Sequence, residues 1–324
     1  MSNSKGSALI LVILVVSLLS LLVVVSSDRL TLSLKNSATF STNTQSYWFA
    51  MAIESSATNF LQSVKRIDQT NYIGEGNLIT NRIDANVDGV NIQGYLRDLN
   101  SCFNLNLLVK KNKEELIRNE EAINIFKSLL LNLNIDEFSS SEILPSLLDW
   151  LDSNDFTEDA NGAEDDFYTR LDAPYKTSNQ LIFDLYELLN IKGFDKKLVQ
   201  SLESHICVIP NDSKTKFNLN SISKNNPELL SAFFENQISL SEASQILLDR
   251  PIDGFKDKEE FWSHPSLENI KRNNNIDKYL SFSSNYFELE TKVSNPMNSY
   301  KMTSVLYINK SNNISVVKRH LSGI

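Results

Sequence analysis

The chain opens with an uncharged apolar stretch that runs from Ser7 to Val25, directly behind Lys5 and Gly6. A helix over these residues would be about 28 Å long at ~1.5 Å per residue, close to the ~30 Å hydrocarbon core of a bilayer. A secretory signal peptide is the alternative, but its apolar region is shorter, roughly 7 to 15 residues, and ends at a small-x-small cleavage site that Val25-Ser26-Ser27 matches poorly. The stretch therefore predicts a membrane helix near the start of the chain.

Length, charge and cysteine content limit what can follow this helix. A chain of 324 residues has room for one large or two moderate domains. The formal net charge of -9 and the pI of about 5.0 argue against nucleic acid as a ligand, because Lys and Arg supply most of the affinity for phosphates. The two cysteines, Cys102 and Cys207, make either one disulfide or two free thiols, and an oxidising compartment would favour the disulfide.

Hydrophobic periodicity divides the rest of the chain into a helix, strands, a helical block and further strands. A helical pattern without Gly or Pro continues from Asp28 to Arg66, so we expect one long helix that begins in the membrane and continues outside it. Strands are expected at 87–98, 102–107, 286–290, 301–309 and 314–318. Helices are expected at 114–133, 141–151, 178–189, 196–205, 227–235 and 239–248. Because strands flank the helical block, we expect the strands to form one sheet and the helices to be an insertion.

Residues 149–167, which we call the acidic loop, carry eight carboxylates and no Lys or Arg. Carboxylates held this close together repel one another unless they are solvated, protonated or gathered around a cation. Ca2+ is the natural cation, because it takes roughly six to eight oxygen ligands in flexible geometry. The spacing does not match an EF-hand, since Phe156 falls on the third ligand position and no Gly follows. The residues alone leave two alternatives, an irregular calcium site and a solvated acidic loop.

Residues typical of catalysis are few. The three histidines, His205, His264 and His320, are far apart in the sequence, and none lies in a metalloprotease or phosphate-loop motif. Pairs of carboxylates that could act as in a glycosidase occur in any chain with 40 acidic residues, so they carry almost no information. We therefore expect a protein that is not an enzyme.

Four features follow one another along the chain: Gly6 behind a short basic leader, an apolar helix beginning at Ser7, an amphipathic continuation and a small antiparallel sheet. In this order they resemble type IV pilins and the pseudopilins of type II secretion. The resemblance implies that an inner-membrane prepilin peptidase cuts between Gly6 and Ser7 and methylates the new amino terminus. Most members carry a glutamate five residues into the mature chain, where this chain has Leu11. A subunit without that glutamate suits the tip of a filament, where no subunit above brings a charged amino terminus that needs a partner.

Two acidic motifs and the large insertion narrow this resemblance. Asp149-Trp150-Leu151-Asp152 and Gly162-Ala163-Glu164-Asp165 look like an Asp-Trp-x-Asp and Gly-Ala-Glu-Asp signature, and Phe217-Asn218-Leu219-Asn220 is similar to a strand before a second helical subdomain. Over nearly its whole length the chain resembles the K-type minor pseudopilins. The implied fold class is α+β, with a long pilin-like N-terminal helix on a small antiparallel sheet and an inserted all-helical, SAM-like domain. The expected divisions are a leader at 1–6, a transmembrane half-helix at 7–27, the soluble half-helix and first strands at 28–108, the insertion at 109–278 and the last strands at 279–324.

The same resemblance implies a role, a location and a metal. K-type minor pseudopilins cap the tip of the periplasmic pseudopilus beside I-type and J-type minor pseudopilins, and a single inner-membrane helix anchors their periplasmic domain. A periplasmic location would favour a disulfide between Cys102 and Cys207. These pseudopilins bind calcium in the inserted domain, which implies a Ca2+ site in the acidic loop. The expected ligands are Asp149, Asp152, Asp155, Glu164, Asp165 and Asp166.

Residues 217–255 also resemble the helix-hairpin-helix and SAM-like modules that bind DNA or proteins elsewhere. The alternative function is therefore that of a membrane-anchored, competence-like DNA-binding protein. This segment lacks the Gly-rich hairpin and the neighbouring Lys residues that would grip phosphate, and the net charge opposes the alternative. We therefore expect no nucleic-acid partner. The apolar residues expected to lie in the core of this segment are Phe233, Phe234, Ile238, Leu240 and Ile246.

Overall fold

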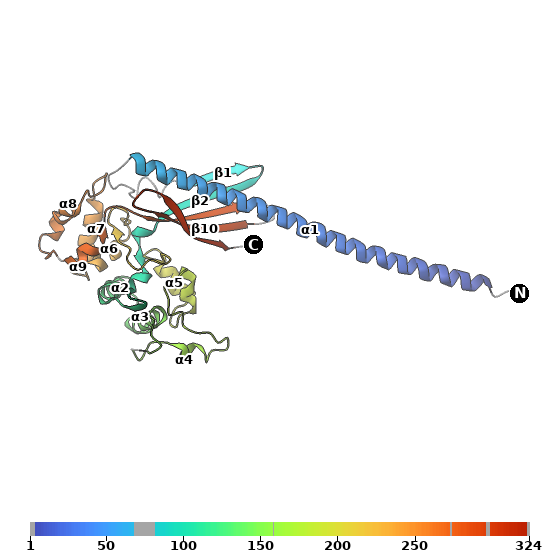
Figure 1. Ribbon diagram of the computed structural model, residues 1–324, viewed down its shortest axis with the longest axis horizontal. Coiled ribbons are helices and arrows are strands. Elements are labelled where there is room, and N and C mark those ends of the chain that lie inside the picture. The colour runs from blue at the N-terminus through green and yellow to red at the C-terminus, as the bar shows by residue number, and fades with distance from the viewer. Residues whose placement is uncertain (1–3, 68–81, 158, 273, 296–298, 323–324) are drawn as a thin grey trace.

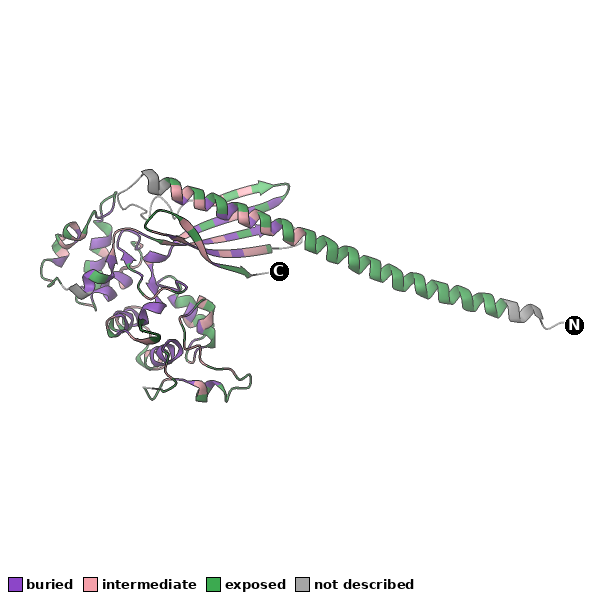
Figure 2. Ribbon diagram, in the orientation of Figure 1, coloured by how far each residue is buried: buried purple, intermediate pink, exposed green. Residues whose placement is uncertain are grey.

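The computed structural model describes residues 4–67, 82–157, 159–272, 274–295 and 299–322, so residues 1–3 of the expected leader and residues 68–81 lie outside the description. Helix α1 (Ser4–Ile67) projects its first half away from the body of the protein and lays its second half across a sheet (Figure 1). From Leu9 to Ser41 its side chains are exposed (Figure 2). Among the described residues, α1 is the one helix that is long and apolar enough to cross a membrane. The expected long N-terminal helix is confirmed.

An antiparallel five-stranded sheet lies against the second half of α1. The strand order is β1-β2-β9-β10-β11. In the pairing of β2 with β9, Asn91 lies opposite Ser294 and Asp98 opposite Phe287, so strands from both sides of the helical block form one sheet, as expected. The strands are β1 (Ile83–Val87), β2 (Val90–Asp98), β9 (Tyr286–Ser294), β10 (Ser299–Ile308) and β11 (Ile314–Ser322).

One face of α1 packs on this sheet. Ala50, Ile53, Ala57 and Leu61 recur at helical spacing and are buried against apolar residues of β2, β9 and β10. Gly94 of β2 lies below the helix, where an added Cβ would come within 2.8 Å of Ile53 Cγ2. The missing side chain at Gly94 therefore lets the helix approach the strand closely.

The insertion between β2 and β9 has a hydrophobic core of its own. Its α-helices are α2 (Glu120–Asn132), α3 (Glu137–Leu151), α4 (Asp165–Tyr168), α5 (Lys196–Leu202), α6 (Pro227–Phe233), α7 (Leu240–Leu248), α8 (Lys258–Trp262) and α9 (Asn274–Tyr279). Its 3-10 helices are η1 (Leu99–Ser101), η2 (Leu105–Leu108), η3 (Leu185–Asn190) and η4 (Pro265–Leu267). Its described residues also form three two-stranded pairs: β3 (Phe103–Asn104) with β6 (Ile206–Cys207), β4 (Val109–Asn112) with β5 (Glu115–Arg118), and β7 (Phe217–Asn218) with β8 (Leu280–Ser281).

The insertion is wider than the predicted span of 109–278, because the sheet ends at Asp98 and resumes at Tyr286. The strand expected at 102–107 is wrong, since this segment forms turns of 3-10 helix around the short β3. Asn104 Oδ1 accepts a hydrogen bond from the backbone N–H of Asn106, and Asn106 Nδ2 donates to the carbonyls of Ile182 and Ile209. The alternation that suggested a strand thus comes from buried asparagines that bind backbone groups.

Two expected helices also differ from the structure. The first residues of 114–133 belong to the β4–β5 hairpin, which turns at Lys113 with φ at 55°, and α2 begins only at Glu120. In the segment 178–189, only the last part is helical. It forms η3, at whose start Asp184 and Glu187 make a reciprocal capping box. Both segments contact the core through apolar residues, and periodicity over so few residues does not separate a helix from a hairpin.

The neck between the sheet and the insertion contains the two cysteines. Cys102 and Cys207 are joined by a disulfide, with their Cα atoms 5.7 Å apart. They lie in a small buried cluster with Leu99, Ile209 and Val305 of the sheet. Cys207 lies in β6, and Cys102 directly precedes β3, which pairs with β6 in parallel. The disulfide therefore closes the base of the insertion.

Candidate functional site

The acidic loop begins in the last turn of α3 and ends in α4, at the end of the insertion that lies away from the sheet (Figure 1). Asp136 begins α3 by accepting a hydrogen bond from the backbone N–H of Ser139. Asp149 and Trp150 lie buried in the last turn of this helix. The chain then returns along α3, because the N–H of Ala163 donates to Asp149 Oδ2 at 2.9 Å. The two acidic motifs seen in the sequence are thereby brought together.

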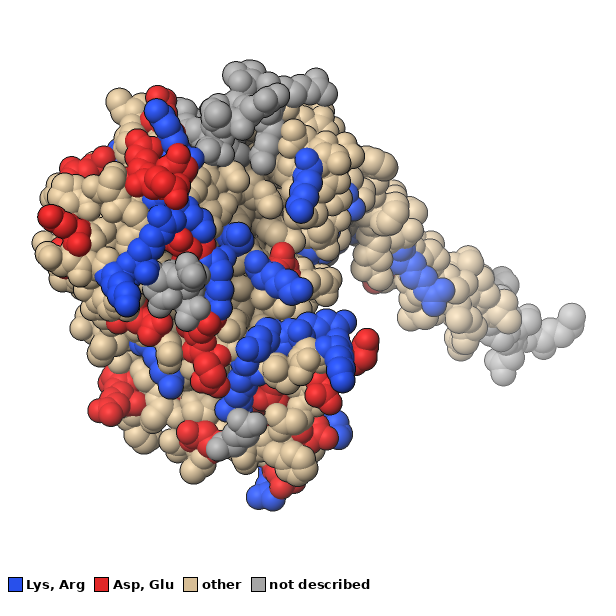
Figure 3. Space-filling model, turned by 60° about the vertical axis from the view of Figure 1, so that its left-hand side comes forward, with Lys and Arg blue, Asp and Glu red and all other residues tan. Residues whose placement is uncertain are grey.

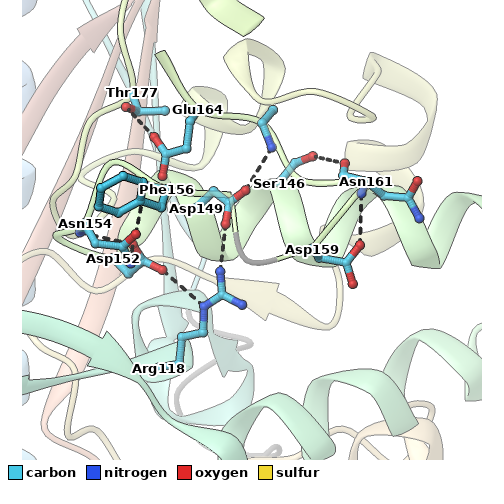
Figure 4. A network of polar contacts seen from close by, with 11 residues as sticks. Arg118, Ser146, Asp149, Asp152, Asn154, Phe156, Asp159, Asn161, Glu164 and Thr177 are labelled. Atoms are coloured by element: carbon cyan, nitrogen blue, oxygen red, sulfur yellow. Dashed lines mark hydrogen bonds and ion pairs between the residues drawn. The ribbon is translucent and has the colours of Figure 1, made fainter. Parts of the chain in front are cut away.

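Arg118, at the end of β5, joins the two aspartates of the first motif (Figure 4). Its Nη2 donates to Asp149 Oδ1 at 2.7 Å, and its Nε donates to Asp152 Oδ2 at 3.1 Å. Both carboxylates are buried, and only 17% of the Arg118 side chain is exposed. Burial raises the pKa of Asp149 to about 6 despite the neighbouring guanidinium.

Glu164, from the second motif, is buried beside this ion pair. Its Oε2 accepts a hydrogen bond from Thr177 Oγ1 at 3.1 Å, whereas its Oε1 is buried and has no hydrogen-bond partner among the residues that the structure describes. Burial raises the pKa of Glu164 to about 7, and repulsion from Asp149 and Asp152 adds to the rise. An unpartnered carboxylate oxygen among other acids is costly, and a bound cation would relieve that cost.

The remaining predicted ligands point elsewhere. Asp165 accepts hydrogen bonds from Lys176 Nζ and from the backbone and hydroxyl of Thr177, which lower its pKa. Asp155 is exposed and accepts a hydrogen bond from Asn179 Nδ2 at 2.8 Å. Asp166 is exposed on α4. Of the six expected ligands, Asp149, Asp152 and Glu164 are thus buried near one another, but among the described residues they are not grouped so as to hold a metal ion.

Two residues of this site, Thr177 and Arg118, were not singled out in the sequence. Thr177 lies beyond the acidic loop. Arg118 lies 31 residues before Asp149, so no local spacing in the sequence reveals that these two residues pair. Gly162 belongs to the quoted motif, but its role is steric. An added Cβ would collide with Asp149 Oδ2 and come within 3.1 Å of the carbonyl oxygen of Asp159. Gly162 therefore lets the backbone lie directly against the buried carboxylate.

Asp149, Asp152 and Glu164 offer carboxylate oxygens, the donors that a hard divalent cation prefers, and Oε1 of Glu164 has no hydrogen-bond partner among the described residues. Among the described residues, however, no three His, Cys, Asp or Glu side chains are grouped so as to hold a metal ion. Glu158 of the acidic loop lies outside the described residues. The arrangement is that of an ion-pair network around Arg118.

Other candidate residues fall into separate environments. His205 Nε2 lies 3.6 Å from Glu228, and His264 Nε2 lies 3.4 Å from Asp249. In the segment that suggested DNA binding, four of the five expected core residues, Phe233, Phe234, Ile238 and Ile246, are buried. The fifth, Leu240, is 40% exposed, because it is the first residue of α7.

The class of protein follows from these observations. The long N-terminal helix α1 leaves its apolar half free and packs its other half on an antiparallel sheet. A helical domain is inserted between two neighbouring strands of this sheet, β2 and β9. This arrangement is a pilin-like architecture. The α+β fold expected from the sequence is confirmed.

Comparison with known families identifies the particular family. Two family models, both described as type II secretion system (T2SS), protein K, match residues 101–211 and 217–283. The chain belongs to the family of type II secretion system protein K.

Curated relatives and a solved structure agree with this assignment. The type II secretion system protein K of Klebsiella pneumoniae is 30% identical over 82% of this chain and 81% of its own length. A putative protein K of Escherichia coli K12 is 31% identical over 72% of this chain and 71% of its own length. Protein K of Aeromonas hydrophila is 29% identical over 97% of this chain and 96% of its own length. A chain of the GspK-GspI-GspJ complex from enterotoxigenic E. coli has a similar fold, with a TM-score of 0.74, 23% identity, and coverage of 86% of this chain and 96% of that one.

Proposed function

We propose that this chain is a non-catalytic minor pseudopilin that caps the tip of the periplasmic pseudopilus in type II protein secretion. The observation that carries the proposal is the uncharged stretch from Ser7, with Leu11 where most pseudopilins have glutamate. In a bundle of parallel helices, a charged amino terminus is costly unless a carboxylate of the neighbouring subunit pairs with it. A subunit without this carboxylate leaves the next amino terminus unpaired, which suits a position where no subunit follows.

The part of α1 between the apolar stretch and the sheet offers a surface for lateral partners. Large apolar side chains exposed on this part are Leu30, Leu32, Leu34, Phe40 and Trp48. Exposed apolar surface of this kind is typical of protein interfaces. We propose that I-type and J-type minor pseudopilins cover it, and the complex formed by the structurally similar chain with GspI and GspJ supports this choice.

Co-purification tests the proposed assembly. The full chain, tagged and co-expressed in detergent-solubilised membranes, should retain both I-type and J-type subunits. Phe40→Ser and Trp48→Ala should each lower the recovery of partners about tenfold, the factor that ~1.4 kcal/mol represents for an aromatic anchor. Phe138→Ser, which changes a side chain 79% exposed on α3, is the matched control and should leave recovery unchanged.

Failure to retain either partner, combined with salt-sensitive binding to DNA, would favour the DNA-binding alternative. A DNA-binding surface needs a continuous basic patch. On the face drawn in Figure 3, Lys and Arg side chains lie among Asp and Glu side chains. This mixture supports the proposal that nucleic acid is not a partner.

We also propose that prepilin peptidase cleaves the chain between Gly6 and Ser7 and methylates Ser7, leaving α1 as an inner-membrane anchor with the remaining domain in the periplasm. The positive Lys5 before the apolar stretch agrees with cytoplasmic retention of this end. An intact-mass measurement of the membrane form should give a methylated chain that starts at Ser7. A chain that keeps Met1, or one cut near Ser26, would exclude this route.

Calcium is the proposed ligand of the acidic loop. A cation that binds only the folded protein stabilises it by RT ln(1 + [L]/Kd), about 2.7 kcal/mol at one hundred times Kd. Chelation should therefore lower the Tm of the full chain by about 5–10 °C. Magnesium should not restore it, because this ion demands octahedral geometry and dehydrates reluctantly. A Tm that chelator leaves unchanged would show that the loop is a solvated acidic segment.

A further inference from the structure

A groove of about 600 Å3 lies between α2 and α3, and one face of each helix forms its walls. The lining residues of each helix recur at helical spacing, which places them on the same side of that helix. The apolar residues among them are Ile123, Leu130 and Leu131 of α2, and Leu144, Pro145 and Leu148 of α3. The groove therefore lies between two largely apolar helix faces.

The length of the groove suits a helix. Its lining follows α2 from Glu120 to Leu131, a distance of roughly 17 Å at ~1.5 Å per residue. About three turns of a helix have this length, whereas a small molecule would fill only part of it. An amphipathic helix that lays its apolar side chains between two other helices is a common mode of protein recognition.

Two features of the groove would be satisfied by a bound segment. Leu131 is 68% exposed although it lines an apolar wall. Pro145 has no N–H, so the carbonyl of Ser141 lacks its regular helical hydrogen bond, and both residues line the groove. A bound helix would cover the leucine and bring donors to this backbone acceptor.

The charges around the groove favour a basic occupant. Glu120, Glu137 and Asp159 line it and are exposed, and none of them makes an ion pair with Lys or Arg in the described part of the chain. Of the two basic residues in the lining, Arg118 already pairs with two buried aspartates, which leaves Lys127 against three acids. This excess of negative charge repels nucleic acid and anionic lipid headgroups and attracts Lys and Arg side chains.

We propose that the groove between α2 and α3 binds an amphipathic helix of a protein partner, with Lys or Arg residues at the ends of that helix. The apolar side chains of the bound helix contact Leu131 and Leu144, and its basic ends lie beside Glu120 and Glu137. Helices α2 and α3 lie on the side of the sheet away from α1 (Figure 1). This partner is therefore distinct from subunits that pack along α1, and the inference does not depend on the proposed function.

Binding of two designed peptides to the full chain in phosphatidylcholine nanodiscs tests this inference. One helical peptide carries leucines at positions i, i+3, i+4 and i+7 between terminal lysines, and the other has glutamates in place of the lysines. Empty nanodiscs measure the partition of each peptide into lipid, which is subtracted. The lysine peptide should bind at least about tenfold more tightly than the glutamate peptide at low salt, and high salt should reduce this difference.

Variants of exposed residues locate the binding to the groove. Leu131→Ser should weaken binding of the lysine peptide about tenfold, as expected for an apolar anchor. Leu248→Ser is the matched control, because this leucine is 56% exposed at the end of α7, outside the groove, and it should leave the affinity unchanged.

A second pair of variants tests the charges. Glu120→Gln combined with Glu137→Gln should weaken binding of the lysine peptide about fourfold, because two exposed ion pairs are lost. Asp253→Asn combined with Glu268→Gln removes two exposed acids outside the groove and should have no effect. Equal affinities for the two peptides, no binding beyond that of empty nanodiscs, or full binding by Leu131→Ser would overturn the inference. Dimerisation of the chain that Leu131→Ser abolishes would assign the groove to a second copy and would also overturn it.

Discussion

Replacing Cys102 and Cys207 together by alanine should lower the free energy of unfolding by about 4–5 kcal/mol. The two cysteines are separated by 105 positions, and the chain-entropy model assigns about 4.7 kcal/mol to a closed loop of about 100 residues. The loop contains α2 to α5 and the acidic loop, so most of the first half of the insertion loses this constraint. Alanine is preferable to serine here, because both cysteines are buried and a hydroxyl would have to be desolvated.

Urea unfolding of the full chain in detergent, with and without reductant, measures this effect. Reductant should shift the midpoint of the wild-type protein toward that of the double variant and should leave the double variant unchanged. The variant itself is therefore the control for non-specific effects of the reductant. A wild-type midpoint that does not respond to reductant, together with two thiols that titrate in denaturant, would contradict the disulfide.

Arg319→Met should lower the free energy of unfolding by about 2 kcal/mol, less than the roughly 3–5 kcal/mol for breaking a fully buried ion pair, because Glu54 is buried but 42% of the Arg319 side chain is exposed. Glu54 lies on the sheet-facing side of α1 and is 4% exposed. Arg319 of β11 donates to both of its oxygens, at 2.8 and 2.9 Å, and Ser304 of β10 donates at 2.6 Å. Without Arg319, a buried carboxylate would remain with the serine alone.

The pH dependence of stability gives the same pair a separate signature. Burial raises the pKa of Glu54, but the hydrogen bonds from Arg319 and Ser304 and the guanidinium charge outweigh burial and bring the pKa below its usual 4.5. A carboxyl with a lowered folded pKa stabilises the protein above its unfolded pKa, and this contribution is lost as the pH falls through the folded pKa. The wild type should therefore lose stability below about pH 4.5, and Arg319→Met should lose less.

Urea unfolding at pH 7 and pH 3.5 separates these expectations from a general charge effect. Lys301→Met removes a lysine that pairs with Glu290 at 2.9 Å, but both side chains are about 40% exposed. An exposed pair of this kind contributes roughly 0–1 kcal/mol, so the variant should unfold close to the wild type. Equal losses for Lys301→Met and Arg319→Met would show that the buried position of Glu54 has no special role.

The sequence predicts the pilin-like half of the fold well, because each of its elements has one apolar face. In β2 and β9, buried and less buried residues alternate along the strand, so a period of two is visible. In α1, the buried residues recur at helical spacing, and the uncharged stretch marks its free half. The sheet partners on either side of the insertion could be inferred because strands flank the helical block on both sides.

The neck and the acidic loop were harder to predict, because their polar residues act over long sequence separations. Asn106 binds backbone carbonyls 76 and 103 positions away, so its neighbours in the sequence resemble a strand although the segment is a turn. The sequence of the acidic loop reveals its carboxylates but not the guanidinium that pairs with them, because Arg118 lies in the β4–β5 hairpin. Composition gave the charge of the site, and only the fold places Arg118 among its acids.

The position of this chain in a pseudopilus tests the central claim most directly. Pseudopili assembled with a gold-binding tag at the exposed Lys113 turn of the insertion can be counted by electron microscopy, with a tagged major pseudopilin as the control that labels the whole filament. The proposed tip position predicts label at one end of each pseudopilus and none along its length. Label at intervals along the filament would contradict the proposal that a chain with Leu11 in place of the glutamate ends the assembly.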